Sequence, residues 1–159
     1  MAEYKLESSW ILWNHGLKDN NWNNDSYKQI FTINNLYDYK ILDEIINSNI
    51  LQNTMFFIMR ENIFPTWEDK NNRNGCCASF KIPSKYIKNS WNNLLKNMIG
   101  ENIHNNIENY KYITGISITP KKEFNIIKIW FSKIIKDVKS IININDTYIN
   151  SKNCRIKKN

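Results

Sequence analysis

The sequence has 159 residues, a formal net charge of +7 and 42% hydrophobic residues. This hydrophobic content supports a folded core and excludes a disordered chain, and the length favours one domain. The positive charge favours a polyanionic partner, such as nucleic acid or a phosphorylated ligand. An AT-rich genome, which also enriches Asn and Ile, raises the Lys content without any such partner.

Several protein classes are excluded by motifs that the sequence lacks. It has no GxxxxGK phosphate loop, no HExxH motif and no Glu cluster on one helix, so we expect a binding protein without a cofactor rather than an enzyme. The adjacent Cys76 and Cys77 have poor geometry for a disulfide, and reduced thiols fit a cytosolic or nuclear protein. His15 and His104 are isolated, which predicts no metal site. We expect neither a signal peptide nor a membrane span.

Two strands and a helix are predicted first. The runs SWILW and YKQIFTI have the short, partly alternating apolar pattern of β-strands. A helix over residues 36–46 follows, because Asn35 is a suitable N-cap and Asp38 falls in the first turn. Its apolar face consists of Leu36, Tyr39, Leu42, Ile45 and Ile46.

Strand pairs and helices alternate along the rest of the chain. TMFFIM and ASFKI are the next strands, followed by a helix over residues 87–99 that ends at Gly100. The apolar face of that helix consists of Ile87, Trp91, Leu94, Leu95, Met98 and Ile99. TGISIT and NIIKIWF are two further strands. A third helix is expected around residues 133–142, with Ile134, Ile135, Val138, Ile141 and Ile142 inside and Lys133, Lys136 and Lys139 outside.

This order of elements predicts an α+β fold, in which an antiparallel sheet carries helices on one face and leaves the other face free. In NIIKIWF, Ile127, Ile129 and Phe131 share one face, which has the composition of a core. The opposite face contains Ile126, Lys128 and Trp130, and its mixture of cation and indole suits a ligand surface. We expect a single domain over residues 1–159, with an ordered core over about 6–150 and a basic tail over 151–159.

Two tryptophans stand in stretches too polar to form a core by themselves. Trp22 lies in DNNWNND and Trp67 lies in FPTWEDK. Each indole either folds back into a core, which is the better interpretation for Trp10, Trp13 and Trp91, or stays near water to meet a flat partner. Two such indoles on separate loops can sandwich a planar ring, and each stacking contact with a base contributes about 1–3 kcal/mol.

Glu68 directly follows Trp67 and can make such a sandwich selective for one base. Guanine presents two neighbouring N–H donors on its Watson–Crick edge, and one carboxylate accepts both, whereas adenine lacks that pair. A cationic ring would gain a further cation–π attraction of about 1–2 kcal/mol. The basic residues would then meet phosphates.

Several motifs, in this order, resemble the eukaryotic translation initiation factor 4E family, which binds the 7-methylguanosine cap of mRNA. They are W-x-x-W at Trp10 and Trp13 with Trp22 nine residues on, NLYDYK over 35–40, IFPTWEDKNNRNG over 63–75, Trp91 followed by LL and by IGE over 99–101, and Gly115 with KIW over 128–130. The resemblance covers about residues 6–130. It implies a single curved antiparallel sheet with about three helices on the convex face and the ligand site on the concave face.

The resemblance also implies a role for individual residues. Trp22 and Trp67 correspond to the two stacking tryptophans, and Glu68 corresponds to the carboxylate that reads the guanine edge. Trp130 corresponds to the tryptophan near the N7-methyl group, and Lys121 stands where the family has a phosphate-binding Arg. Methylation at N7 makes the base cationic, so the sandwich prefers the methylated base over plain guanine.

The phosphate-binding part of the pattern is altered in this chain. Ile126 stands where the family has a second phosphate-binding Lys, and Lys122 or Lys128 can substitute for it. The family sequence G-G-R-W reads GCCA over residues 75–78, so an Arg and a structural Trp are replaced. The resemblance therefore implies phosphate binding by Lys121, Lys122 or Lys128 in an altered arrangement.

The surface for protein partners is altered as well. The family docks the scaffold factor 4G and the 4E-binding proteins through a Trp of its first helix, where this chain has Lys40, or Tyr37 or Tyr39 in a shifted register. The partner is then either a scaffold of the 4G type or a replacement for it. The chain is thus expected to be a monomer that acts in translation initiation or its control.

Two other functions remain open at this stage. One is a general single-stranded RNA-binding module, and the other is a cap-binding competitor or repressor that does not engage the usual scaffold. The tail SKNCRIKKN either touches RNA beyond the cap or is a solvated, disordered end. The Asn- and Ile-rich composition suits a giant virus or an AT-rich unicellular parasite, and a viral protein would act in the host cytoplasm.

Overall fold

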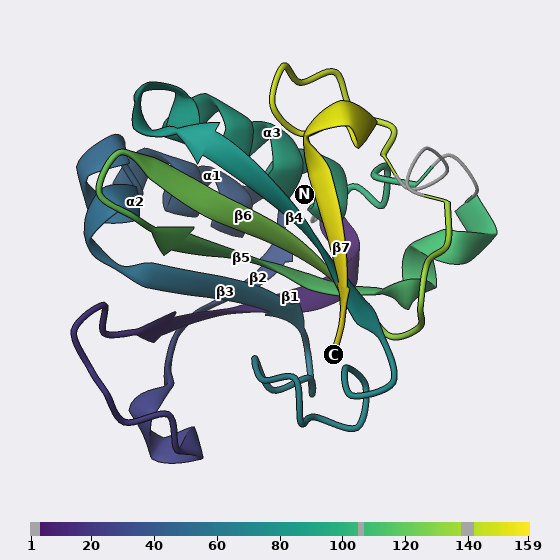
Figure 1. Ribbon diagram of the computed structural model, residues 1–159, viewed down its shortest axis with the longest axis horizontal. Coiled ribbons are helices and arrows are strands. Elements are labelled where there is room, and N and C mark those ends of the chain that lie inside the picture. The colour runs from purple at the N-terminus through teal and green to yellow at the C-terminus, as the bar shows by residue number, and fades with distance from the viewer. Residues whose placement is uncertain (1–3, 105–106, 138–141) are drawn as a thin grey trace.

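Seven strands form one antiparallel sheet in the computed structural model, which describes residues 4–104, 107–137 and 142–159 (Figure 1). The strands are β1 Lys5–His15, β2 Lys28–Asn35, β3 Met55–Arg60, β4 Cys76–Pro83, β5 Ile113–Pro120, β6 Phe124–Phe131 and β7 Cys154–Lys158. Their order across the sheet is β2-β1-β3-β5-β6-β4-β7. The six strands predicted from the sequence are all present, and β7 is an addition to them.

Three α-helices lie on one face of the sheet (Figure 1). They are α1 Leu36–Ile45, α2 Ser48–Asn53 and α3 Ile87–Ile99. Side-chain caps explain where the first two begin, since Oδ1 of Asn35 accepts a hydrogen bond from the backbone N–H of Asp38, and Oδ1 of Asn47 accepts one from Ile50. The helix α3 buries the apolar face that its sequence predicts and is followed by Gly100, as expected.

The sheet separates a large apolar core from a small one. The large core lies between the sheet and the helices and includes Trp10 and Trp91, which are 0% and 1% exposed, as predicted. Ile127, Ile129 and Phe131 of β6 also belong to this core, whereas Trp130 faces the other way. The face assignment made for NIIKIWF is therefore confirmed.

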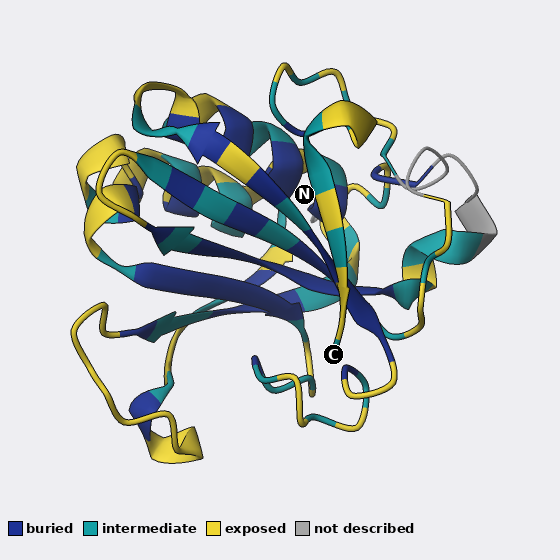
Figure 2. Cartoon of the chain, in the orientation of Figure 1, coloured by how far each residue is buried: buried dark blue, intermediate teal, exposed yellow. Residues whose placement is uncertain are grey.

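The small core lies on the face opposite to the helices. It consists of Met55, Phe57, Met59, Cys77 and Trp130, with Trp13, Tyr27 and Ile63 packed against it. Because the large core covers one face of β3 and the small core covers the other, β3 is buried along almost its whole length (Figure 2). The face of the sheet opposite to the helices thus carries an apolar, aromatic layer.

The third predicted helix is wrong over its described part. Residues 132–137 contain no helix, and Ile134 is 42% exposed rather than buried. Val138, Lys139 and Ile141 lie outside the described residues, whereas Ile135 and Ile142 do pack against the large core. The helix α2 takes the third place on this face, and its short sequence SNILQN gave no periodic signal.

The basic tail, expected to lie outside the ordered core, contributes the edge strand β7. It pairs antiparallel with β4, with Cys77 opposite Lys157 and Ser79 opposite Arg155. Cys154 and Ile156 of β7 pack against the large core. Side chains alternate along a strand, so Arg155 and Lys157 point to the face that carries the small core.

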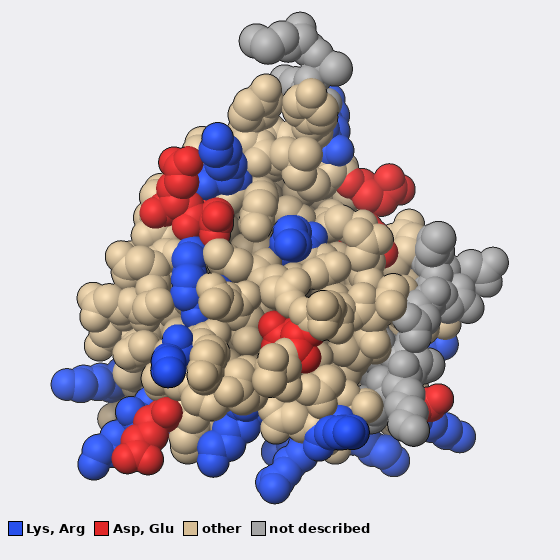
Figure 3. Space-filling model, turned by 90° about the horizontal axis from the view of Figure 1, so that it is seen from above, with Lys and Arg blue, Asp and Glu red and all other residues tan. Residues whose placement is uncertain are grey.

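The surface on the helix side differs from the sheet edge in charge. Seen from above the view of Figure 1, this surface is largely uncharged, and many Lys and Arg side chains project from one rim (Figure 3). The helix α1 carries exposed apolar side chains, namely Leu36, Tyr37, Ile41 and Ile45. Among the described residues, no helix is both long enough and apolar enough to span a membrane.

Candidate functional site

Two loops extend from the sheet on the side opposite to the helices (Figure 1). The Trp22 loop, residues 16–26, connects β1 to β2, and the Trp67 loop, residues 61–75, connects β3 to β4. Trp22 is 55% exposed and Trp67 is 56% exposed. Neither indole is buried in a core, which leaves large apolar surfaces open to a partner.

Buried and half-buried polar side chains fix the shape of the Trp67 loop. Oδ2 of Asp69 accepts a hydrogen bond from the backbone N–H of Phe64 at 3.0 Å, and its Oδ1 accepts one from Asn71 at 2.8 Å. Asn72 is 0% exposed and donates from Nδ2 to the carbonyl of Thr66 at 2.9 Å. These bonds turn the chain tightly around Trp67.

The same loop is joined to the sheet. The hydroxyl of Thr114 on β5 donates to Oδ1 of Asn72 at 2.8 Å, and the side chain of Asn159 donates to the carbonyl of Asn72 at 2.7 Å. Gly75 leaves no room for a side chain, because a Cβ at this position would overlap the backbone carbonyl of Phe131 on β6. The base of the loop is therefore fixed by three strands.

The Trp22 loop is held by its own polar residues. The backbone N–H of Asn21 donates to Oδ1 of Asp19, and that of Asn23 donates to Oδ1 of Asn21, each at 2.8 Å. Such Asx contacts explain the abundance of Asn and Asp in this segment, since these side chains mimic a backbone turn. Among the described residues, the hydrogen bonds of the loop stay within residues 15–28.

One buried residue, His15, supports the Trp22 loop, and no motif in the sequence indicates this role. The imidazole is 0% exposed and stacks on the indole of Trp22, with 4.0 Å between ring centroids and 2° between ring planes. Its Nδ1 lies 3.0 Å from the carbonyl oxygen of Gly16, and its Nε2 lies 2.7 Å from that of Asn21. A neutral ring donates to one of these oxygens and a protonated ring donates to both.

Tyr27 connects the two loops. Its ring lies 5.0 Å from the ring of His15 and 6.4 Å from Trp22, and on the other side it lies 5.4 Å from Phe64 of the Trp67 loop. Burial raises the pKa of the Tyr27 hydroxyl above its ordinary value, and the negative charge of the exposed Glu68 raises it further. The charge of Glu68 therefore acts on the aromatic cluster that contains Tyr27.

A cavity of about 400 Å³ lies beside Trp67 on the same face of the sheet. It is lined by Trp67, Cys77, Ser79, Lys128, Trp130, Lys157, Lys158 and Asn159. The indole of Trp130 is 8% exposed, and its Nε1–H donates to the hydroxyl of Ser117 at 2.9 Å, which fixes the ring in the wall of the cavity. The cavity therefore combines an exposed indole, a fixed indole and several cations.

The cations that line this cavity come from the two strands that flank β4. Burial raises the pKa of the Cys77 thiol to about 12, while the positive charges of Lys128 and Lys157 act in the opposite direction. Both ammonium groups thus influence the cavity floor, Lys128 from β6 and Lys157 from β7. Cys77 itself is buried and protonated, as expected for an inert thiol.

The structure brings together some of the sequence-predicted site residues and leaves others apart. Trp67, Trp130 and Lys128 line one cavity, whereas Trp22 is not among the described residues that line it. Lys121 and Lys122 are exposed in the turn between β5 and β6. The basic tail was a candidate RNA contact, but its lysines were not expected to line this cavity, because their position depends on pairing with β4 about 80 residues earlier in the chain.

The predicted partner-docking residues lie on α1 with different exposures. Tyr37 is 53% exposed and its ring lies 6.2 Å from that of Tyr4, and Lys40 is also exposed. Tyr39 is half-buried against the large core, and burial raises the pKa of its hydroxyl, with a smaller contribution from the charge of Asp43. Of the three candidates, Tyr37 and Lys40 are available at the surface.

Solved structures with the same fold have been determined with ligands and binding proteins. The chain is 22% identical to C. elegans eIF4E-3 in complex with the 4E-binding protein Mextli and a cap analog, covering 83% of this chain and 76% of that one with a TM-score of 0.74. It is also 22% identical to Ascaris suum eIF4E-3 with an m7G cap, covering 85% and 77% with a TM-score of 0.71. A Schistosome eIF4E complexed with m7GpppG and 4E-BP is 18% identical, covering 86% and 76% with a TM-score of 0.75.

At these identities the structures establish that the fold is shared. The family itself is established by the sequence model named Eukaryotic initiation factor 4E, which matches residues 5–157 and therefore almost the whole chain. The three helices, the two Trp-bearing loops and the sheet, apart from Lys158 at the end of β7, lie within the matched range. This chain belongs to the eukaryotic initiation factor 4E family.

Proposed function

We propose that this protein binds the 7-methylguanosine cap of mRNA and acts in translation initiation or its control, as a binding protein rather than an enzyme. The observation that carries the proposal is that two half-exposed indoles, Trp22 and Trp67, stand on loops on the side of the sheet opposite to the helices, with Trp67 beside a cavity lined with lysines. One face of Trp22 is covered by His15, and the base would use the other face.

The methylated base would stack between Trp22 and Trp67. Stacking contributes about 1–3 kcal/mol per contact, and the positive charge of the methylated ring adds cation–π attraction of about 1–2 kcal/mol. Glu68 would accept the two N–H donors of the guanine edge. Trp130, held by Ser117, would face the N7-methyl group from the wall of the cavity.

The phosphates of the cap would meet the lysines of the cavity. Lys128 and Lys157 are the best placed, since both act on the Cys77 thiol at the cavity floor. Lys157 lies opposite Cys77, which stands where the family has an Arg, so β7 offers a replacement for that lost charge. Lys121 and Lys122, in the turn that follows β5, would contact phosphates that extend toward that turn.

A titration of 7-methyl-GTP against GTP, followed by tryptophan fluorescence, tests the proposal. We expect tighter binding of the methylated nucleotide, and loss of binding in Trp22→Ala and in Trp67→Ala. Tyr37→Ala is the matched control, because it removes an equally exposed aromatic residue from the opposite side of the sheet. Equal affinity for GTP and 7-methyl-GTP would instead indicate a general single-stranded RNA-binding module.

The base-reading role of Glu68 has a separate test. Glu68→Gln keeps the size of the side chain but replaces one acceptor with a donor, so we expect weaker binding and reduced preference for guanine over adenine. Glu61→Gln, at another exposed position of the same loop, is the control. An unchanged preference for guanine in Glu68→Gln would show that the Glu68 carboxylate does not recognise the base.

We further propose that the exposed apolar surface of α1 docks a protein partner. Two of the similar structures, from C. elegans and from Schistosome, contain 4E-binding proteins. Tyr37 and Ile41 are exposed one helical turn apart, with Lys40 beside them. A partner that docks here is either a scaffold of the 4G type or its replacement, and Ile41→Asp should prevent its binding without affecting 7-methyl-GTP. A protein with no such partner would act as a cap-binding competitor.

A further inference from the structure

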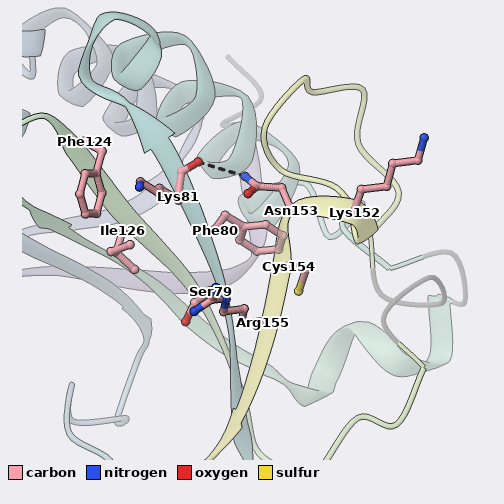
Figure 4. A pocket seen from close by; sticks show the side chains of 9 residues that line it. All are labelled: Ser79, Phe80, Lys81, Phe124, Ile126, Lys152, Asn153, Cys154 and Arg155. Carbon is pink, nitrogen blue, oxygen red and sulfur yellow. Dashed lines mark hydrogen bonds between the residues drawn. The ribbon is translucent and has the colours of Figure 1, made fainter.

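A second cavity, of about 450 Å³, adjoins the Trp67 cavity along the sheet, and Ser79 lines both (Figure 4). Lys81 and Phe124 line one side of it, and Arg155 of β7 lies beside Ser79 (Figure 4). For the tail that forms β7, the sequence left open whether it touches RNA or is a solvated end. We call the surface formed by Ser79, Lys81, Phe124 and Arg155 the β7 track.

Strand register makes the β7 track a continuation of the Trp67 cavity. Lys157 lies opposite Cys77, and Arg155 lies opposite Ser79, two residues further along both strands. Residues two apart in a strand are about 7 Å apart and point to the same face. The cations of β7 therefore form a row that leads away from Trp67 toward Phe124.

The charge of this surface is of one sign. None of the residues that line either cavity is acidic, and the cations Lys81, Lys128, Arg155 and Lys157 lie along them. Lys81 and Arg155 are both exposed. Such a row attracts a polyanion of extended shape and concentrates it along the strand.

An aromatic ring lies next to the cations. The ammonium group of Lys81 lies 4.2 Å from the centre of the Phe124 ring, and Phe124 is half-buried at the start of β6. A cationic groove with a stacking ring is the combination that binds single-stranded nucleic acid without sequence preference, because every base has a flat face. An acidic peptide would use the cations but would gain little from the ring.

We propose that the β7 track binds the nucleotides that follow the cap, with Arg155 and Lys81 contacting the sugar-phosphate backbone and Phe124 stacking on a base. This inference rests on the proposed function for its starting point, since the cap in the Trp67 cavity would place the next phosphates over Ser79. The track extends the footprint of the protein from a nucleotide to a segment of single-stranded RNA.

The test compares four ligands in a filter-binding or anisotropy assay: 7-methyl-GTP, the dinucleotide m7GpppG, a capped unstructured RNA of about ten nucleotides, and the same RNA without a cap. The variant is Lys81→Ala/Arg155→Ala, at two exposed positions whose backbone pairing is unaffected. The control is Lys40→Ala/Lys96→Ala, which removes the same charge from exposed positions on the helices α1 and α3.

We expect the wild-type protein to bind capped RNA more tightly than m7GpppG. The track variant should lose that gain, by about tenfold at moderate salt, while its affinity for 7-methyl-GTP stays within about twofold of wild type. The negative slope of log K against the logarithm of the salt concentration should decrease in magnitude by about 1.4, that is, by about 0.7 for each lost phosphate contact. Phe124→Leu should weaken RNA binding while leaving this slope unchanged.

The outcomes separate the track from the cap site. If capped RNA binds no better than m7GpppG, or if both double variants weaken RNA binding equally, the proposed RNA binding by the β7 track is refuted. The proposed cap binding is not affected by either result. If 7-methyl-GTP does not bind, yet uncapped RNA binds and is lost in the track variant, the cap proposal fails and the track stands. If Phe124→Leu has no effect on RNA binding, the stacking contact is refuted.

Discussion

The two loops that carry Trp22 and Trp67 present equally exposed indoles but are supported in opposite ways. The Trp67 loop is joined to the sheet by Asn72 and Gly75, with contacts to β5, β6 and the end of β7. The Trp22 loop depends on local Asx contacts and on one stacked ring, His15. The loop that carries Trp67 is thus anchored to the sheet, whereas the loop that carries Trp22 is held mainly by contacts among neighbouring residues.

This difference assigns separate tasks to the two loops. In the proposed cap site, a well-anchored Trp67 loop with the Glu68 carboxylate would give the base a defined position and orientation and would reduce the entropy cost of binding. A loop held by few contacts opens at low free-energy cost, so the Trp22 loop would be the part that moves to admit or release the proposed ligand. We expect substitutions in the Trp67 loop to affect folding and binding together, and substitutions in the Trp22 loop to affect mainly binding.

The largest effect is expected at Gly75. Gly75→Ala forces a Cβ into the carbonyl of Phe131, which must separate β4 from β6, so the free energy of unfolding should fall by about 3 kcal/mol or more. Gly16→Ala in the Trp22 loop is the matched control, because its Cβ meets only Asp19, at 3.3 Å from Cβ, and should cost less than about 1 kcal/mol. Urea unfolding measures both, and equal losses would contradict the comparison.

The next effect is expected at Asn72. Asn72→Ala leaves the carbonyl of Thr66 and the hydroxyl of Thr114 without their partner in a buried place, at a cost of about 1–3 kcal/mol. Affinity for 7-methyl-GTP should fall as well, because the turn around Trp67 loosens. Asn23→Ala provides the comparison in the other loop, where the side chain is exposed. A stable Asn72→Ala variant with wild-type affinity would show that the loop is fixed by other contacts.

A smaller effect, confined to binding, is expected at His15. His15→Ala removes the ring behind Trp22, so the dissociation constant for 7-methyl-GTP should rise by about fivefold to tenfold, or about 1–1.4 kcal/mol. His15→Phe keeps a stacking ring but removes both contacts to carbonyl oxygens, and should restore part of the affinity. If His15→Ala binds like the wild type, the stacked ring does not position Trp22.

The smallest effect concerns the cavity floor beneath Trp67. With a pKa of about 12, the Cys77 thiol should resist alkylation by iodoacetamide at pH 8, in contrast to the same thiol in urea. The raised pKa also means that the unfolded state loses this proton first as the pH rises above the ordinary value of 9.0, so the free energy of unfolding should fall between pH 9 and 12. Rapid alkylation of Cys77 in the native protein would indicate that the floor opens.

Most of the fold could be predicted because its signals are local. The N-cap at Asn35, the periodic face of α3 and the alternation in β6 each lie within a few residues of sequence, and all three are confirmed. The prediction of a helix after residue 132 was wrong because Ile is abundant throughout the chain, so Ile residues can recur at helical spacing where no helix forms. The strand β7 was missed because its polar, basic sequence gains order only by pairing with β4.

The residues of the candidate site could likewise be predicted only where the sequence signal is local. Trp67 and Glu68 lie in one continuous motif, and their exposure agrees with the prediction. The stacking of His15 on Trp22 depends on how the Trp22 loop folds back on β1, which residue spacing does not reveal. The approach of Lys157 to Cys77 likewise depends on a register between distant segments.

The position of β7 at the rim of the sheet has a consequence for the behaviour of the protein in concentrated solution. The outer side of β7 presents backbone N–H and C=O groups that a strand of another chain could pair with, which is a common route to aggregation. Arg155, Lys157 and Lys158 place like charges along this rim, and two approaching copies would repel each other there. The same cations that are suited to RNA therefore also protect the edge from self-association.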